Sequence, residues 1–272
     1  MSLYLKKLKE NEKERALNVF TTWELSFRQI LAKEDTGQVE ANFLTLFAFF
    51  DCKNISENLF AAFASDRKLY EDSTGLSSSF KLVRKDGEWD SDKFRNILAN
   101  LAQSALLQTW TPSRDTSDNW CHFTLHPLIR DWILLRIDPK TFAQCYVIAT
   151  LSISQLLNPC WNHDEFDLDL FSKGSIQSHI GAHFKHKTSL IEQGKFPVGD
   201  FKEQLLVDDA EFFFAIFLLR FGQYDKANTV TQQVIEWRQT NLGVSIYLFS
   251  PCTKAKYEIP EAKAQRSDFL QV

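Results

Sequence analysis

The sequence predicts a mainly α-helical protein that contains one short β-hairpin. Three observations lead to this expectation. Apolar residues recur at three- and four-residue spacing through most of the 272-residue chain, which is the period of a buried helix face. Strand-like composition is confined to two short runs, 106–110 and 120–125, on either side of a turn-rich segment. Glycine is scarce, with 9 residues where average usage gives about 19, so few positions favour positive φ.

The amino-terminal segment is expected to be helical over residues 4–32, with a break near Thr21 and Thr22. A polar loop follows and ends at Gly37. Residues 1–37 are therefore predicted to form a helical segment that leads into the first domain.

A helix-turn-helix is predicted next. Its first helix begins near Gln38 and has phenylalanines along one face, and residues 51–54 break it. Ser56 then has the position of an N-cap for the second helix. Residues 65–90 are polar and predict a surface loop, with one strand-like piece at 80–83.

A third helix is expected to begin at Ser91 or Asp92, and the β-hairpin described above follows it. A closing helix starts at Pro127, because the fixed φ of proline suits the first helical turn. Three helices, a hairpin and a closing helix make a winged helix-turn-helix domain, which we place at residues 38–138.

The periodic segments after Pro139 are all helical. Gly222, Tyr224 and Ala227 have the G-x-Y-x-x-A spacing of the turn in a tetratricopeptide repeat, where glycine allows the turn, tyrosine packs across it and alanine lets the helices approach. Residues 139–243 are therefore predicted to form antiparallel helical hairpins like those of such repeats. Residues 244–272 lose the periodicity and predict an irregular or disordered tail.

The order of these elements, together with four strings of sequence, resembles the carboxy-terminal half of the nucleotide-binding module of STAND NTPases. This class includes the NB-ARC resistance proteins, and the resemblance is to fungal, NLR-like members that end in tetratricopeptide or kinesin-light-chain-like repeats. The strings lie in residues 19–27, 44–60, 123–132 and 218–243.

In that family a signature histidine reaches the β-phosphate of bound ADP and holds the protein in its inactive state. His126 matches this histidine by position, while Leu125 and Pro127 stand where the family has methionine and aspartate. The phosphate loop and the metal-binding strand of the family would precede Met1. The resemblance therefore implies a regulatory part of an ATPase, of a signalling or self/non-self recognition type, without ATPase activity of its own.

Recognisable catalytic motifs are absent from the sequence. It contains no G-x-x-x-x-G-K-[ST], G-x-G-x-x-G, G-x-S-x-G or H-E-x-x-H string, so we expect no enzyme, no cofactor and no metal site. The longest apolar run, 212–219, is far shorter than the roughly 20 residues that span a bilayer, so no membrane partner is expected. The five cysteines lack C-x-x-C spacing and predict free thiols in a cytoplasmic protein.

Several polar groups have two interpretations. His126 is either a nucleotide sensor or a residue with a local hydrogen bond between a strand and a helix. His179, His183 and His186 would share one helix face, which suits zinc binding or pH sensing, although a solvated or packing face is the simpler interpretation. The acidic run 163–169 lacks the glycine and glutamate of a calcium loop, so an exposed loop is expected there.

The expected partners are proteins that bind the repeat-like helices, and self-association is left open. The apolar run 212–219 is expected to be a buried helix of that region. The alternative function is a winged-helix DNA-binding regulator. Lys93 and Arg95 are the only basic residues in the third helix, and the chain has 31 basic against 35 acidic residues. Nucleic acid is therefore an unlikely partner, since phosphate contacts supply most of the non-specific affinity.

Overall fold

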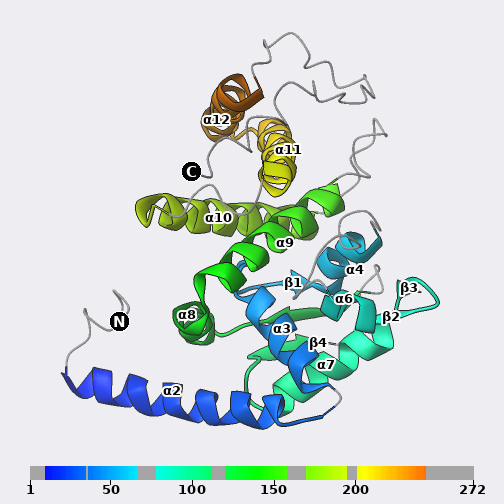
Figure 1. Cartoon of the computed structure of the whole chain (residues 1–272), viewed down its shortest axis with the longest axis vertical. Helices are drawn as coiled ribbons and strands as arrows, with labels where there is room; N and C mark the ends of the chain where they lie inside the picture. Colours follow the sequence, from blue (N-terminus) through cyan, green and yellow to red (C-terminus); the bar gives the residue numbers. More distant parts are fainter. Residues whose placement is uncertain are drawn as a thin grey trace, which may run out of the picture. The chain divides into compact units, whose positions relative to one another are not determined.

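The structure, a computed structural model, describes residues 10–34, 36–65, 78–111, 120–157, 170–194 and 201–242, and it is mainly helical (Figure 1). The mainly α-helical class expected from the sequence is confirmed. The helices are α2 (Glu10–Leu31), α3 (Gly37–Phe47), α4 (Glu57–Ser65), α6 (Ser78–Leu82), α7 (Ser91–Gln103), α8 (Pro127–Arg136), α9 (Pro139–Leu157), α10 (Leu170–Glu192), α11 (Phe201–Arg220) and α12 (Tyr224–Leu242).

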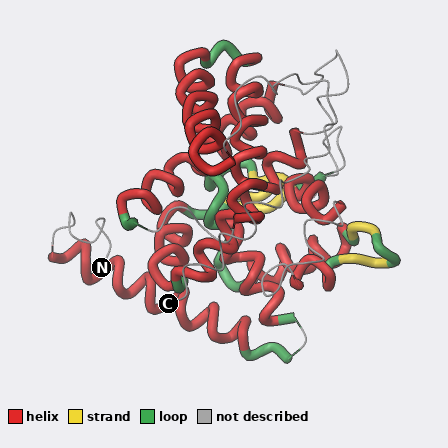
Figure 2. The backbone as a smooth tube through the Cα atoms, turned by 45° about the horizontal axis from the view of Figure 1, so that its top comes forward, coloured by secondary structure: helices red, strands yellow, loops and turns green. Residues whose placement is uncertain are grey.

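The strands are short, and Figure 2 shows them as small pieces among the helices. An antiparallel sheet has the order β1-β5-β4, made of β1 (Ile55–Ser56), β4 (Thr109–Thr111) and β5 (His122–Thr124). Phe123 in the central strand is opposite Ile55 on one side and Trp110 on the other. A separate hairpin pairs β2 (Arg84–Lys85) with β3 (Glu88–Trp89). The pairing of β4 with β5 agrees with the two strand-like runs in the sequence.

Phenylalanine rings fill the core between this sheet and helices α3, α4 and α7. The closest pair is Phe47 and Phe123, whose ring centroids are 4.5 Å apart. Phe43, Phe60 and Phe94 complete the cluster, with mutual centroid distances of 5.3–6.0 Å. Each of the five side chains is at most 2% exposed. Burial of a phenylalanine stabilises a fold by about 1.5–3 kcal/mol, so this cluster fixes how the three helices pack.

The prediction of a strand at residues 80–83 is wrong, because most of this segment belongs to helix α6. Phe80 and Val83 are each 1% exposed, whereas Lys81 and Leu82 between them are exposed. Residues three apart lie on the same side of a helical turn but on opposite faces of a strand, so this burial requires a helix. The expected loop at 66–77 lies outside the described residues.

Two further expectations about helix boundaries are also wrong. The helix does not break at Thr21 and Thr22, because Thr22 Oγ1 donates to the carbonyl of Asn18 at 3.0 Å and is satisfied within α2. Helix α7 is capped neither by Ser91 nor by Asp92. Asp90 is the N-cap, and its carboxylate accepts from the backbone N–H of Lys93 at 3.0 Å.

Helix α9 is the common packing partner of the later helices. It contacts α4, α10 and α11, which explains why every residue from Cys145 to Ser154 is buried. The chain divides into two compact units, 1–231 and 232–272, and the part of α12 after Thr231 belongs to the second. The boundary expected at residues 138 and 139 stays a prediction. The acidic run 163–169 and the tail 244–272 lie outside the described residues.

Candidate functional site

His126 joins strand β5 to helix α8 and caps that helix. Its backbone is extended, with φ −65° and ψ 133°, and its Nδ1 accepts from the backbone N–H of Leu128 at 3.1 Å. Pro127 follows as the first helical residue, where its missing N–H costs nothing. The structure therefore shows the local hydrogen bond between strand and helix, and the nucleotide-sensor interpretation of His126 stays a prediction.

An aromatic cluster holds α8 against α2 beside His126. The Trp23 ring lies 6.3 Å from the His126 ring and 6.3 Å from that of Trp132, and Phe27 meets Trp132 edge-on at 5.8 Å. The guanidinium of Arg136 lies 3.8 Å above the Phe27 ring, within range of a cation–π contact. His126 is half-buried, and within the described part of the chain its Nε2 has no hydrogen bond.

Helix α10 brings His179, His183 and His186 onto one face, as their spacing predicts, and this face packs inward. His179 is 1% exposed and His183 is 3% exposed, so the packing interpretation is correct and the solvated one is wrong. The three rings point to different partners. No group of three or more histidine, cysteine, aspartate or glutamate side chains in the described residues could hold a metal ion.

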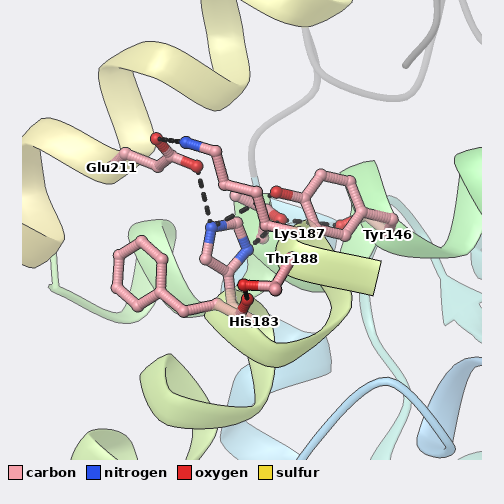
Figure 3. Close-up of polar contacts among 7 residues, drawn as sticks. Tyr146, His183, Lys187, Thr188 and Glu211 are labelled. Carbon is pink, nitrogen blue, oxygen red and sulfur yellow. Dashed lines mark hydrogen bonds and ion pairs between the residues drawn. The ribbon is translucent and has the colours of Figure 1, made fainter. Parts of the chain in front are cut away.

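His183 belongs to a buried polar network that joins α9, α10 and α11 (Figure 3). Glu211 reaches from α11 toward α10, where one carboxylate oxygen lies 3.0 Å from His183 Nε2 and the other 2.5 Å from Lys187 Nζ. On the α9 side, Thr150 Oγ1 lies 2.9 Å from His183 Nδ1, and the Tyr146 ring stacks on the imidazole at 5.0 Å. All five side chains are at most 9% exposed.

The charges of this network follow from burial and pairing. Burial opposes ionisation of Glu211, but the hydrogen bond from His183 and the charge of Lys187 outweigh it and lower the pKa of Glu211. Burial lowers the pKa of His183 and outweighs its hydrogen bond to Glu211. His183 Nε2 faces the Glu211 carboxylate, and Nδ1 faces the Thr150 hydroxyl, which donates its hydrogen to the Tyr146 carbonyl at 2.7 Å. The network is thus a buried Lys–Glu ion pair with His183 on the second carboxylate oxygen.

This network was not predicted from the sequence. Its members are far apart in the chain, because Glu211 is 28 residues from His183 and pairs with Lys187 in the interior. The available signal was a charged residue directly beside the apolar run 212–219, which predicts a buried partner.

The predicted repeat turn connects α11 to α12. Gly222 has φ +71°, and the backbone N–H groups of Gly222 and Gln223 donate to the carbonyls of Leu219 and Leu218 at 3.1 Å and 2.9 Å. This is a helix end in which glycine accommodates the left-handed residue. Ala227 is 3% exposed, as a close helix pair requires.

Tyr224 does not pack across this turn as expected, because its side chain is 66% exposed. Tyr224 is the first residue of α12, and helical side chains lean toward the N-terminus of their helix. Its ring therefore extends past the turn into solvent. Leu219, at the end of α11, is also 51% exposed.

The apolar run 212–219 lies in α11. Phe214, Phe217 and Leu218 are at most 3% exposed, while Phe212 and Phe213 are half-buried. Its interior part is thus buried as expected. Of the helices in the described ranges, none has both the length and the apolar character needed to cross a membrane.

The basic residues near the start of α7 face groups of the chain itself. Lys93 Nζ lies 3.2 Å from the Arg84 carbonyl and 3.8 Å from the Asp90 carboxylate. Arg95 Nε lies 3.5 Å from the buried carboxylate of Glu57. These intramolecular contacts hold Lys93 near the N-cap of α7 and Arg95 near Glu57 of α4.

Comparison of the chain with protein-family models, with curated proteins and with solved structures found no match. Function is therefore inferred from the contacts described above.

Proposed function

We propose that the chain is a non-catalytic regulatory and protein-interaction element of the STAND type. In this proposal residues 38–138 are a winged helix-turn-helix domain, and residues 139–243 are tetratricopeptide-like helical hairpins. The chain would transmit the state of a nucleotide site that it does not itself form, and it would bind protein partners through the hairpins.

The observation that carries the proposal is the pairing of β1 with β5. No strand was expected at Ile55 and Ser56, yet this strand lies between α3 and α4 and pairs with the β4–β5 hairpin. The resulting order is α3, β1, α4, α7, β4, β5 and α8, apart from the small inserted elements α6, β2 and β3. A winged helix has this order of helices with a three-stranded sheet at its base, so the topology supports the assignment.

The position of His126 supports the STAND type within that assignment. The residue directly precedes α8, and its cap bond uses Nδ1 and leaves Nε2 without a hydrogen bond in the described part of the chain. A nucleotide sensor needs a ring that is held in place and has one nitrogen available. The contacts with Leu128 and Trp23 meet the first need, and the Nε2 of this half-buried residue, which has no hydrogen bond in the described part of the chain, meets the second.

The turn between α11 and α12 supports the protein-interaction part of the proposal. Gly222 closes the turn, Ala227 is buried, and Leu219 and Tyr224 present apolar surface beside it. Exposed aromatic and aliphatic side chains of this kind are enriched at protein interfaces.

Titration calorimetry of the full chain with ADP and with ATP, in the presence of Mg²⁺, tests the proposal. We expect no heat of binding at nucleotide concentrations up to millimolar, and no release of phosphate from ATP. Micromolar binding of either nucleotide would contradict it, because the chain would then form a nucleotide site of its own.

A second experiment separates the proposal from the DNA-binding alternative. The contacts of Arg95 with Glu57 and of Lys93 with Asp90 argue for weak phosphate binding. We expect no shift of a random duplex by the chain at 50 mM salt, where non-specific affinity is strong. A salt-dependent shift that Lys93→Ala weakens, and that exposed Lys140→Ala leaves unchanged, would favour the alternative.

A further inference from the structure

The loop between α3 and β1 is held on α10 by its hydrogen bonds with His179 and Ser175. His179 Nδ1 accepts from the backbone N–H of Asp51 at 3.1 Å, and the His179 ring meets Phe50 edge-on at 5.6 Å. Ser175 Oγ donates to the Asn54 carbonyl at 2.9 Å. We call the contact between α10 and residues 49–54 the α10–loop interface.

His179 fits this interface only as a neutral ring. Its Nδ1 must be an acceptor, because its partner is the N–H of Asp51. Its Nε2 lies 3.1 Å from Ser175 Oγ, whose proton is given to the Asn54 carbonyl, so Nε2 carries the hydrogen. A second proton on Nδ1 would set one donor against another, and it would place a charge in a site that is 1% exposed.

His186 supports the same interface from two helical turns further along. Its ring lies between Phe49, at 5.0 Å, and Phe142 of α9, at 6.0 Å. The positive charges that face it are those of Arg130 on α8 and Lys185 on α10, together with His183 if that residue is protonated. Protonation of His186 would add a further positive charge to this group.

His183 differs from the other two because it faces the Glu211 carboxylate at 3.0 Å. A proton on His183 would be compensated by that charge, with Lys187 and Tyr146 as the other ionisable neighbours. Within the described part of the chain, Asp51 is the carboxylate whose charge acts on His179, and it only partly offsets the cost of charging that ring.

We propose that the α10–loop interface is an acid-sensitive joint, in which protonation of His179 and His186 releases helix α10 from residues 49–54 while the phenylalanine core of α3, α4 and α7 stays folded. This proposal does not depend on the STAND assignment. Protonation would change the conformation by separating α10 from residues 49–54. This change requires no ligand.

The direction of the pH dependence follows from the two pKa values. Burial lowers the pKa of His179 and of His186 from 6.5 to about 4. In the docked state α10 contacts residues 49–54, and in the released state it does not. Above pH 6.5 both rings are neutral in both states, so the ratio of docked to released molecules is highest there. As the pH falls below 6.5 the released state binds protons first, and docking weakens until the pH reaches about 4. At pH 5 each histidine lowers the ratio of docked to released molecules by roughly 30-fold.

Amide hydrogen exchange of the full chain, corrected for the intrinsic effect of pH, tests the proposal. We expect protection of the Asp51 amide and of residues 48–54 to fall between pH 7 and pH 5, while protection of residues 94–101 in α7 persists. Equal loss in both segments would mean global unfolding and would overturn the proposal. Unchanged protection of residues 48–54 down to pH 4.5 would also overturn it.

His179→Gln and His126→Asn are the matched variants. Glutamine offers a non-titrating acceptor to the Asp51 amide, so the pH of release should move downward. His126→Asn removes an imidazole outside the interface and keeps an N-cap, so that pH should not move. An equal effect of both variants, or of neither, would contradict the assignment. If His179→Gln does not fold, NMR titration of the ring protons of the wild-type protein tests the proposal instead. A pKa near 6.5 for His179 in the docked state would overturn it.

Discussion

Lys187 of α10 and Glu211 of α11 form a buried ion pair, with Nζ 2.5 Å from a carboxylate oxygen, and His183 contacts the other oxygen of the same carboxylate. The two residues are 24 positions apart in the sequence, and their contact joins α10 to α11. Charges in the interior are costly unless each is compensated, so the packing of α11 on α10 depends on both residues being present.

Glu211→Gln should therefore destabilise the protein strongly. It keeps the shape of the side chain but removes the charge that faces Lys187, and loss of one partner of a buried pair costs about 3–5 kcal/mol. Urea unfolding at pH 7.5 measures the effect. The control is Arg28→Gln, since Arg28 forms an ion pair with Glu24 on the surface of α2 and its side chain is 72% exposed. That variant should change stability little, and equal losses in the two variants would contradict the interpretation.

Gly37→Ala should destabilise the junction of α2 and α3. A Cβ atom at Gly37 would lie 2.2 Å from the carbonyl oxygen of Ile30, which is backbone and cannot move aside. Steric clashes of this kind lower the free energy of unfolding by about 1–3 kcal/mol.

Gly181→Ala is the matched control for that substitution. Gly181 lies within α10, and a Cβ there meets nothing within 4 Å. Alanine should stabilise the helix by up to about 1 kcal/mol. Thermal unfolding of both variants should give shifts of opposite sign, and a loss of stability in both would show that α10 has less room than the structure indicates.

Ala105→Gly should stabilise the end of α7. Ala105 follows the helix with φ +56°, and the N–H of Leu106 donates to the Leu101 carbonyl at 3.0 Å. Glycine adopts this left-handed conformation without the roughly 1 kcal/mol cost that a Cβ imposes. Ala102→Gly, within α7, should cost about 1 kcal/mol instead. Chemical denaturation measures both changes. If the free energy of unfolding changed in the same direction in the two variants, the result would be inconsistent with a positive φ at Ala105.

His126→Ala should cost about 1 kcal/mol, because it removes the acceptor of the Leu128 N–H at the start of α8. His126→Asn should restore most of that stability through its side-chain oxygen. Differential scanning calorimetry measures both changes. If the two variants melted at the same temperature, the ring would hold α8 by its contact with Trp23 rather than by the cap bond.

Several elements could be predicted because their determinants are local. Phe43 and Phe47 lie one helical turn apart, Pro127 suits only the first turn of a helix, and Gly222 permits the turn between α11 and α12. Periodicity and backbone preference act within a few residues, so they can be recognised without the partner surface.

One error is local, because Thr22 looks like a helix breaker but its hydroxyl has an acceptor within α2. The other errors arise where a distant residue decides. Ile55 and Ser56 become a strand only because β5 pairs with them. Residue 80 becomes helical because its side chain fits among Phe43 and Phe63. Tertiary contacts outweigh local preferences of a few tenths of a kcal/mol in each of these cases.

The candidate site divides in the same way. The spacing of His179, His183 and His186 is enough to place them on one helix face, since helical geometry alone fixes that. Their roles came from the fold, which supplied the Asp51 amide and the Glu211 carboxylate from other parts of the chain. Burial and pairing set the charge of a side chain, and both depend on residues brought together only by folding.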